Sequence, residues 1–131
     1  MLTKEEHIEY WINTSNDDFE VFEILYKNKN FLHALFIAHL SFEKLIKAFW
    51  VRDNDNNIPP KAHNLIFIVK QTKLLLSQEQ MTLLALLNDF QIQGRYPDYK
   101  LKIKKMLTKE YVDNLLPHLM ELRECLKEMI V

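Results

Sequence analysis

The strongest pattern of apolar positions runs from residue 31 to residue 52, FLHALFIAHLSFEKLIKAFWVR. Apolar residues recur there every three or four positions, which is the spacing of one face of an α-helix. Polar side chains are scarce before Glu43, Lys44 and Lys47. A helix so apolar around its circumference must be covered on several sides, so the pattern predicts the central helix of a bundle or a subunit interface on its apolar flank. Its stripe is Phe31, Leu35, Ala38, Phe42, Leu45 and Phe49.

Four further segments have helical spacing. They begin after Thr3, near Lys61 or Ala62, after Ser77 and after Thr108. The segments that follow Thr3 and Ser77 each start with a capping box, because Glu or Gln stands three residues after the cap. With short loops between them, these helices predict an all-α fold, an up-and-down four-helix bundle with one additional helix, about five helices in all.

The turn chemistry of the chain is concentrated at Gly94-Arg95-Tyr96-Pro97. Gly94 is the only glycine, and glycine commonly ends a helix because it adopts the left-handed conformation without a Cβ clash. Tyr96 precedes proline and is therefore biased toward an extended backbone. The pattern predicts a sharp helix end that holds Arg95 at a fixed exit. Residues 98–107 are basic and poorly periodic, which predicts a connector.

Composition supports a helical, ordered protein. The chain has 131 residues, 48% of them hydrophobic, with one glycine and four prolines. We therefore expect a single domain over residues 1–131. One cysteine, Cys125, excludes an intrachain disulfide. No stretch has the pattern of a signal peptide or the length of a membrane span, so the sequence predicts a cytoplasmic protein without a membrane partner.

Charge is distributed unevenly although the net charge is only −1. Residues 1–23 contain seven acidic residues, and residues 95–109 contain six basic residues against one acid, Asp98. A local basic strip can bind phosphate even in a nearly neutral chain. The alternative is that the acidic and basic segments face each other in the fold, and the sequence leaves both interpretations open.

Metal and cofactor chemistry has no support in the sequence. No histidine follows Glu at the Glu-x-x-His spacing of di-iron bundles, one cysteine cannot build a zinc site, and no phosphate-binding loop is present. We therefore predict no cofactor and no metal. His33 and His39 lie on the predicted central helix and are expected in the core or an interface, whereas His63, at a helix start, fits a structural or a ligand-contacting role equally well. Arg95 presents paired donors suited to phosphate or carboxylate, or to an ion pair with another helix.

Four segments in a fixed order carry a resemblance to a known family. The sequence resembles the HEPN domain, the small helical nucleotide-binding or RNA-cleaving domain of prokaryotes and higher eukaryotes. The segments are Tyr10-Trp11 with Ser15 and Asp18-Phe19, then Ala38 to Ala48, then Pro59 to Leu65, and finally Gly94 to Tyr99.

The resemblance implies an all-α bundle that forms a homodimer, with the arginine motif facing a cleft near the dimer interface. Many members of the family are encoded beside a minimal nucleotidyltransferase and act with it as a toxin–antitoxin pair. Active members cut RNA with an arginine followed after four to six residues by histidine. Arg95 matches the arginine, but Lys100, Leu101 and Lys102 occupy the positions of the histidine. The nuclease motif is therefore incomplete, and the sequence leaves enzymatic activity undecided.

The sequence thus predicts a protein that binds nucleotide or RNA phosphate at a cleft around Arg95. Two alternatives stay open. One is a metal-independent RNase that uses a non-standard proton donor, either His63 or a lysine with a lowered pKa. The other is an interaction module without a ligand, pairing with itself or with a nucleotidyltransferase. The residues expected to contact the phosphate are Arg95, Tyr96, Asp98, Lys100, Lys102 and His63, with Arg95 as the only candidate catalytic residue.

Overall fold

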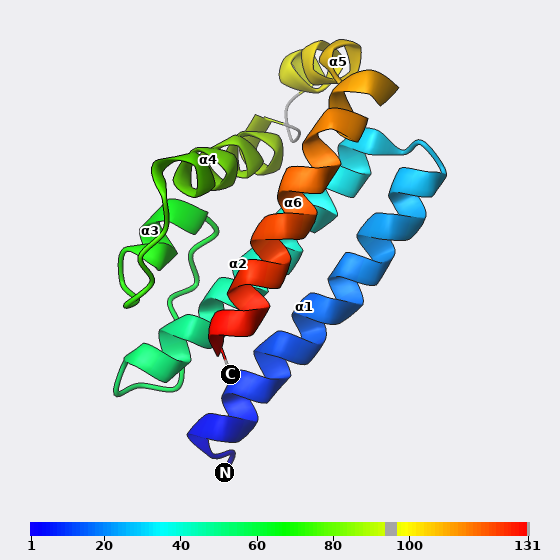
Figure 1. The fold of residues 1–131 in the computed structure, drawn as a ribbon. Helices are drawn as coiled ribbons and strands as arrows, with labels where there is room; N and C mark the ends of the chain where they lie inside the picture. The colour runs from blue at the N-terminus through cyan, green and yellow to red at the C-terminus, as the bar shows by residue number, and fades with distance from the viewer. Residues whose placement is uncertain (94–96, 131) are drawn as a thin grey trace.

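The computed structural model describes residues 1–93 and 97–130, with backbone only for residues 92, 93, 97, 99 and 100. The described part of the chain is helical and contains no strand, which confirms the predicted all-α bundle (Figure 1). The helices are α1 (Lys4–Lys27), α2 (Phe31–Asp53), α3 (Leu65–Val69), α4 (Gln78–Gln93), α5 (Pro97–Met106) and α6 (Lys109–Ile130).

Helix α2 is the centre of the fold, as its apolar pattern predicts. Each of the other helices contacts it. Five of the six stripe residues are buried, and the sixth, Phe31, is half-buried at the first turn. Because α2 presents apolar groups on several sides, it is covered on several sides.

Helix α1 lies along α2 and is fixed to it by two serines. The Ser15 hydroxyl donates to the backbone oxygen of Ser41 at 2.6 Å, and the Ser41 hydroxyl donates to the backbone oxygen of Ser15 at 2.8 Å. Small side chains at this crossing let the helices approach closely, and each buried hydroxyl is satisfied. The predicted capping box is present at the start of α1, with Thr3 and Glu6 bonded reciprocally.

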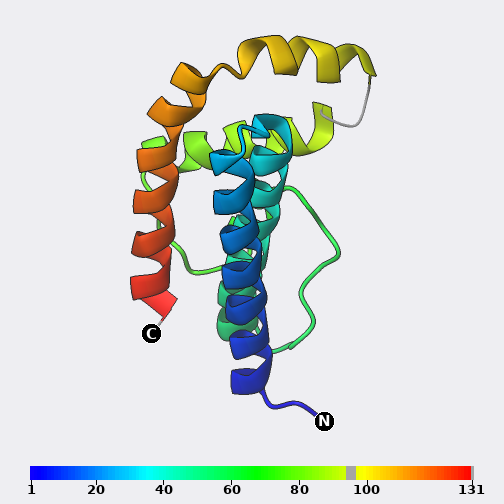
Figure 2. The same cartoon turned by 90° about the vertical axis from the view of Figure 1, so that its right-hand side faces the viewer.

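The helices form two sets by direction. Helices α1, α2 and α6 run along the length of the molecule, whereas α4 and α5 run across one end of it (Figure 2). The connection from α5 to α6 places the start of α6 at that same end. The molecule therefore has a helical cap whose outer member is α5.

Two segments differ from the sequence-based expectation. Helix α3 begins at Leu65 instead of near Lys61 or Ala62, because the side chain of Asn64 caps it by accepting from the Phe67 N–H at 3.2 Å. Residues 98–107, predicted as a connector, lie mostly in helix α5. Its only deeply buried side chains among those described are Ile103 and, just after the helix, Leu107. Two buried residues are too few to give a visible apolar period, so the described residues hold α5 in addition to the about five helices that the sequence predicts.

Candidate functional site

The centre of the predicted phosphate site lies outside the described residues. This applies to Arg95, to Tyr96 and to the side chain of Lys100. The helices on either side are described, α4 to Gln93 and α5 from Pro97, and the helix stop predicted at Gly94 lies outside the described residues. The arginine motif therefore joins the end of one cap helix to the start of the next.

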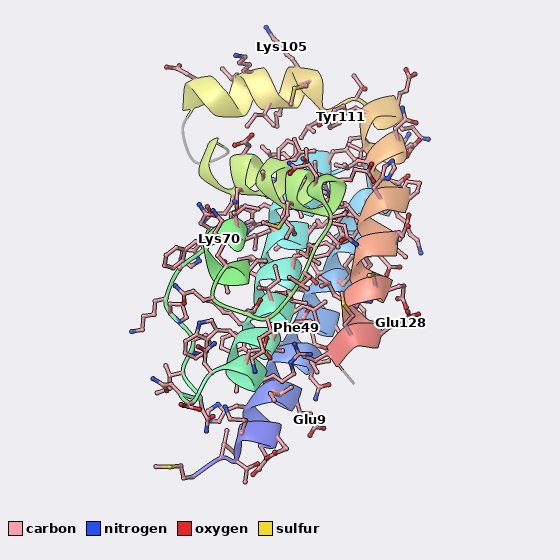
Figure 3. The ribbon with its side chains drawn as sticks, turned by 60° about the vertical axis from the view of Figure 1, so that its left-hand side comes forward. Glu9, Phe49, Lys70, Lys105, Tyr111 and Glu128 are labelled. Carbon is pink, nitrogen blue, oxygen red and sulfur yellow. The ribbon has the colours of Figure 1, made fainter. Side chains whose placement is uncertain are left out.

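Helix α5 presents a basic outer face. Lys102, Lys104 and Lys105 are exposed, and within the described residues none of them forms an ion pair. Figure 3 shows Lys105 pointing away from the body of the molecule. Asp98, at the first turn, is exposed as well, while Ile103 packs into the core on the opposite face. The strip predicted from the sequence is thus a solvent-facing surface in its described part.

The acidic segment at the N-terminus does not neutralise this face through the described contacts. Asp18 pairs with Lys44 on α2 at 2.7 Å, and Lys109 pairs with Asp113 of its own helix at 2.6 Å. No ion pair between the described residues joins α1 to α5. Within the described residues, the lysines of α5 are therefore exposed and have no acidic partner.

The basic surface continues onto the turn between α1 and α2. A hollow of about 280 Å³ there is lined by Lys29, His33 and Lys104, among others. Asn30, the N-cap residue of α2, makes no capping hydrogen bond with its side chain. A helix N-terminus carries partial positive charge, so the hollow adds to the attraction for anions. His33, expected in the core or an interface, is not in the core, because it lies exposed at this rim of α2.

His63 forms the second region of the site together with two charged residues of α2. Its Nδ1 lies 3.0 Å from Oε1 of Glu43, and the other carboxylate oxygen, Oε2, accepts from the Lys47 ammonium at 3.1 Å. The side chains of Glu43 and Lys47 are only 6% and 8% exposed, whereas that of His63 is 55% exposed. The Lys47 ammonium also lies 5.5 Å from the centre of the Trp11 ring. The buried ion pair of Glu43 and Lys47 therefore contacts the exposed His63 ring through Nδ1, on the side of the ring that faces the protein.

A neighbouring set of uncharged contacts fixes the segment that carries His63. The side-chain oxygen of Asn88, on α4, accepts from the Leu65 N–H at 2.9 Å, and its amide nitrogen donates to Asn64 at 2.9 Å. The same oxygen lies 3.3 Å from Nε2 of His39. Asn88 thus ties α2, α4 and the start of α3 together beside His63.

The two regions are adjacent where α5 begins. In Figure 2 the segment that leads from α2 to α3 runs along the same side as the end of α4 and the start of α5. Asn88, whose bonds hold that segment, lies in the second half of α4. The segment that carries His63 therefore lies on the side of the molecule where α5 begins, whereas the lysines of α5 follow this helix across the end of the molecule, and no described contact joins the two regions.

We predict that the protein becomes less stable as the pH falls from 7 to 5, because of His39. Burial lowers the pKa of this fully buried imidazole, against the opposing effect of the Glu43 carboxylate. The unfolded chain then binds a proton below about pH 6.5 that the folded chain does not, so the stabilisation is present above that pH and is lost below it. The expected slope is at most about 1.4 kcal/mol per pH unit.

Urea unfolding at half-unit pH steps measures this slope. The variant His39→Gln should flatten it between pH 5 and 6.5, whereas His118→Gln, which changes an exposed histidine of α6, should leave it unchanged. An equal slope in the wild type and in His39→Gln would contradict the assignment.

Sequence reasoning missed three contributors to this site. Glu43 and Lys47 have the i,i+4 spacing of an ordinary stabilising pair, and Asn88 is a single polar residue in an apolar helix. Only Asn88 carried a signal, because its helical position falls beside Leu84 and Leu87 on the apolar side of its helix, whereas Glu43 and Lys47 lie off the apolar stripe. His63, by contrast, was identified from its place after Pro59-Pro60-Lys61-Ala62.

Two other hollows are lined by neither His63 nor the lysines of α5. A hollow of about 420 Å³ between α4 and α6 is lined by Leu83, Leu86 and Leu122, among others, and shares no residue with the two regions. No group of three or more histidine, cysteine or acidic side chains in the described part of the chain could hold a metal ion. No described helix is long and apolar enough to cross a membrane.

Comparison with known proteins agrees with the all-α architecture. The model of the HEPN domain family matches residues 8–129, nearly the whole chain. The searches of curated proteins and of solved structures each returned no significant match. The family match includes all four segments that carry the resemblance and both regions of the site. The chain therefore belongs to the HEPN domain family.

Proposed function

We propose that this HEPN domain binds the phosphate of a nucleotide or of RNA at the face formed by the α4–α5 junction and α5. The single observation that carries the proposal is the exposed, unneutralised basic face of Lys102, Lys104 and Lys105. In this proposal Arg95 contributes paired guanidinium donors to the same anion, and Tyr96, Asp98 and Lys100 are further proposed contacts. Membership of a family of nucleotide- and RNA-related modules supports this ligand class.

RNA binding by the purified protein tests the proposal through α5. We expect the triple variant Lys102→Ala, Lys104→Ala, Lys105→Ala to bind a fluorescent single-stranded RNA about 10- to 100-fold more weakly at low salt. Because single-stranded RNA releases about 0.7 counterions per phosphate neutralised, the slope of log K against log salt should decrease by about 2. Fluorescence anisotropy at several salt concentrations measures both quantities.

A charge-matched control separates a site from a general charge effect. The variant Lys70→Ala, Lys73→Ala, Lys127→Ala removes the same charge from other helices and loops, and should change affinity little. Equal losses in the two triple variants would contradict a site on α5. Unchanged affinity in Arg95→Ala would show that the arginine is not part of it.

A second function, metal-independent RNA cleavage, has one observation in its favour. His63 is exposed, and its Nδ1 lies at hydrogen-bond distance from the buried carboxylate of Glu43. A histidine that transfers protons in catalysis is often oriented by a carboxylate in this way. Cleavage of RNA in the presence of a chelator, lost in both Arg95→Ala and His63→Gln, would establish this activity. Cleavage that survives Arg95→Ala would indicate a contaminating nuclease.

The partners of the protein are proposed on the family match alone. They are a second copy of the chain, forming a homodimer, and a minimal nucleotidyltransferase acting with it as a toxin–antitoxin pair in the cytoplasm. Light scattering on the purified protein tests the first partner. Co-purification with a nucleotidyltransferase encoded beside it tests the second.

A further inference from the structure

The contact with Glu43 determines which ring nitrogen of His63 donates a hydrogen bond and which one accepts. A carboxylate offers only acceptors, so the Nδ1 atom that lies 3.0 Å from Glu43 Oε1 must carry the proton. In the neutral ring the second nitrogen, Nε2, is then an acceptor. Because Nδ1 points into the protein and the side chain is 55% exposed, Nε2 faces solvent. The neutral ring held by Glu43 therefore presents an outward-facing acceptor.

An outward-facing acceptor does not suit a phosphate oxygen, which is itself an acceptor. It suits a hydroxyl, and the hydroxyl that an RNA strand carries at every nucleotide is the ribose 2′-hydroxyl, which DNA lacks. The amino groups of bases could also donate to Nε2, but RNA and DNA share them. The lysines of α5, by comparison, attract either nucleic acid through its backbone.

We propose that His63 accepts a hydrogen bond from a ribose 2′-hydroxyl and thereby selects RNA over DNA, with Glu43 as the positioning residue that sets its tautomer. This inference rests on the proposed phosphate site, from which the strand would continue past the start of α5 to His63. The phosphate contacts supply affinity for both nucleic acids, and His63 supplies the difference between them.

The groups around His63 hold its ring in one orientation. The charged and titratable groups that interact with it come from α2: Glu43 holds Nδ1, Lys47 shares that carboxylate, and the buried His39 repels a charged His63. Helix α4 contributes the uncharged Asn88, which fixes the adjoining backbone at Leu65.

The positioning role of Glu43 is tested by NMR without any ligand. In protein labelled with ¹⁵N at histidine, and with the ring signals of His63 assigned through His63→Gln, the Nδ1–H form is expected at pH 8. The double variant Glu43→Met, Lys47→Met removes the carboxylate without leaving a lone buried charge, and should allow the Nε2–H form. Glu43→Gln, whose amide oxygen can still accept, should retain Nδ1–H. An Nε2–H ring in the wild type would overturn the assignment.

The selectivity is tested with an RNA and a DNA of one sequence at pH 8. A single hydrogen bond predicts a preference for RNA of roughly 2- to 10-fold. The variant His63→Leu should abolish the preference by weakening RNA binding alone, while His118→Leu should keep it. Equal affinities for the two strands in the wild type, or equal losses in His63→Leu, would overturn the ribose role while leaving the phosphate site intact. Absence of binding to either strand would contradict the phosphate site and the ribose role together, and the NMR result would still decide the role of Glu43.

Discussion

Replacement of Lys47 by methionine is expected to destabilise the folded protein by about 3–5 kcal/mol, the cost of leaving one member of a buried ion pair alone. The Lys47 ammonium lies 3.1 Å from Oε2 of Glu43, and both side chains are less than 9% exposed. Methionine keeps most of the volume of the lysine stem beside Trp11. The loss of stability therefore comes from removing the charge and not from creating a cavity. Without the ammonium, the buried carboxylate has only the exposed imidazole of His63 as a polar partner.

The double variant Glu43→Leu, Lys47→Met distinguishes this explanation from a packing defect. Because apolar residues of similar volume can replace a buried ion pair at little cost, most of the stability should return. The exposed pair of Lys109 and Asp113 supplies the control, and Lys109→Met should change stability little. Urea unfolding measures all three variants. A double variant as unstable as Lys47→Met would show that the ion pair is not the origin of the loss.

Most of the fold was predictable because its determinants are local. The apolar period of residues 31–52 identifies the central helix, and reciprocal side-chain bonds at Thr3 and at Ser77 mark the starts of α1 and α4. Helix α5 was not predictable by the same means. Its exposed face is lysine-rich and also carries Leu101 and Met106, so the apolar residues do not fall on one side.

The site was less predictable than the fold because it depends on contacts between distant parts of the chain. Glu43 and His63 are twenty residues apart, and Asn88 reaches Leu65 across twenty-three. Nothing local distinguishes Glu43 from an acid in a surface i,i+4 pair. The sequence identified His63 as a residue with two open roles, and only the position of the Glu43 carboxylate shows which nitrogen faces outward.

Truncation of Phe42 to alanine is expected to destabilise the protein by about 3–5 kcal/mol, as large-to-small changes of buried aromatic residues do. Phe42 is 1% exposed and belongs to the central stripe of α2. Every other helix contacts α2, so a cavity in this helix cannot be closed by moving one neighbour alone. The lost transfer free energy and the residual cavity therefore add.

Phe67 provides a matched control for the same chemical change. It is 49% exposed on α3, so Phe67→Ala should cost far less than Phe42→Ala in the same urea titration. The conservative variant Phe42→Leu, which leaves a smaller cavity, should fall between the wild type and Phe42→Ala. If the slope of the free energy of unfolding against urea concentration is unchanged and only the midpoint shifts, the variant has lost stability and not compactness. Equal effects of Phe42→Ala and Phe67→Ala would contradict the assignment of α2 as the centre of the core.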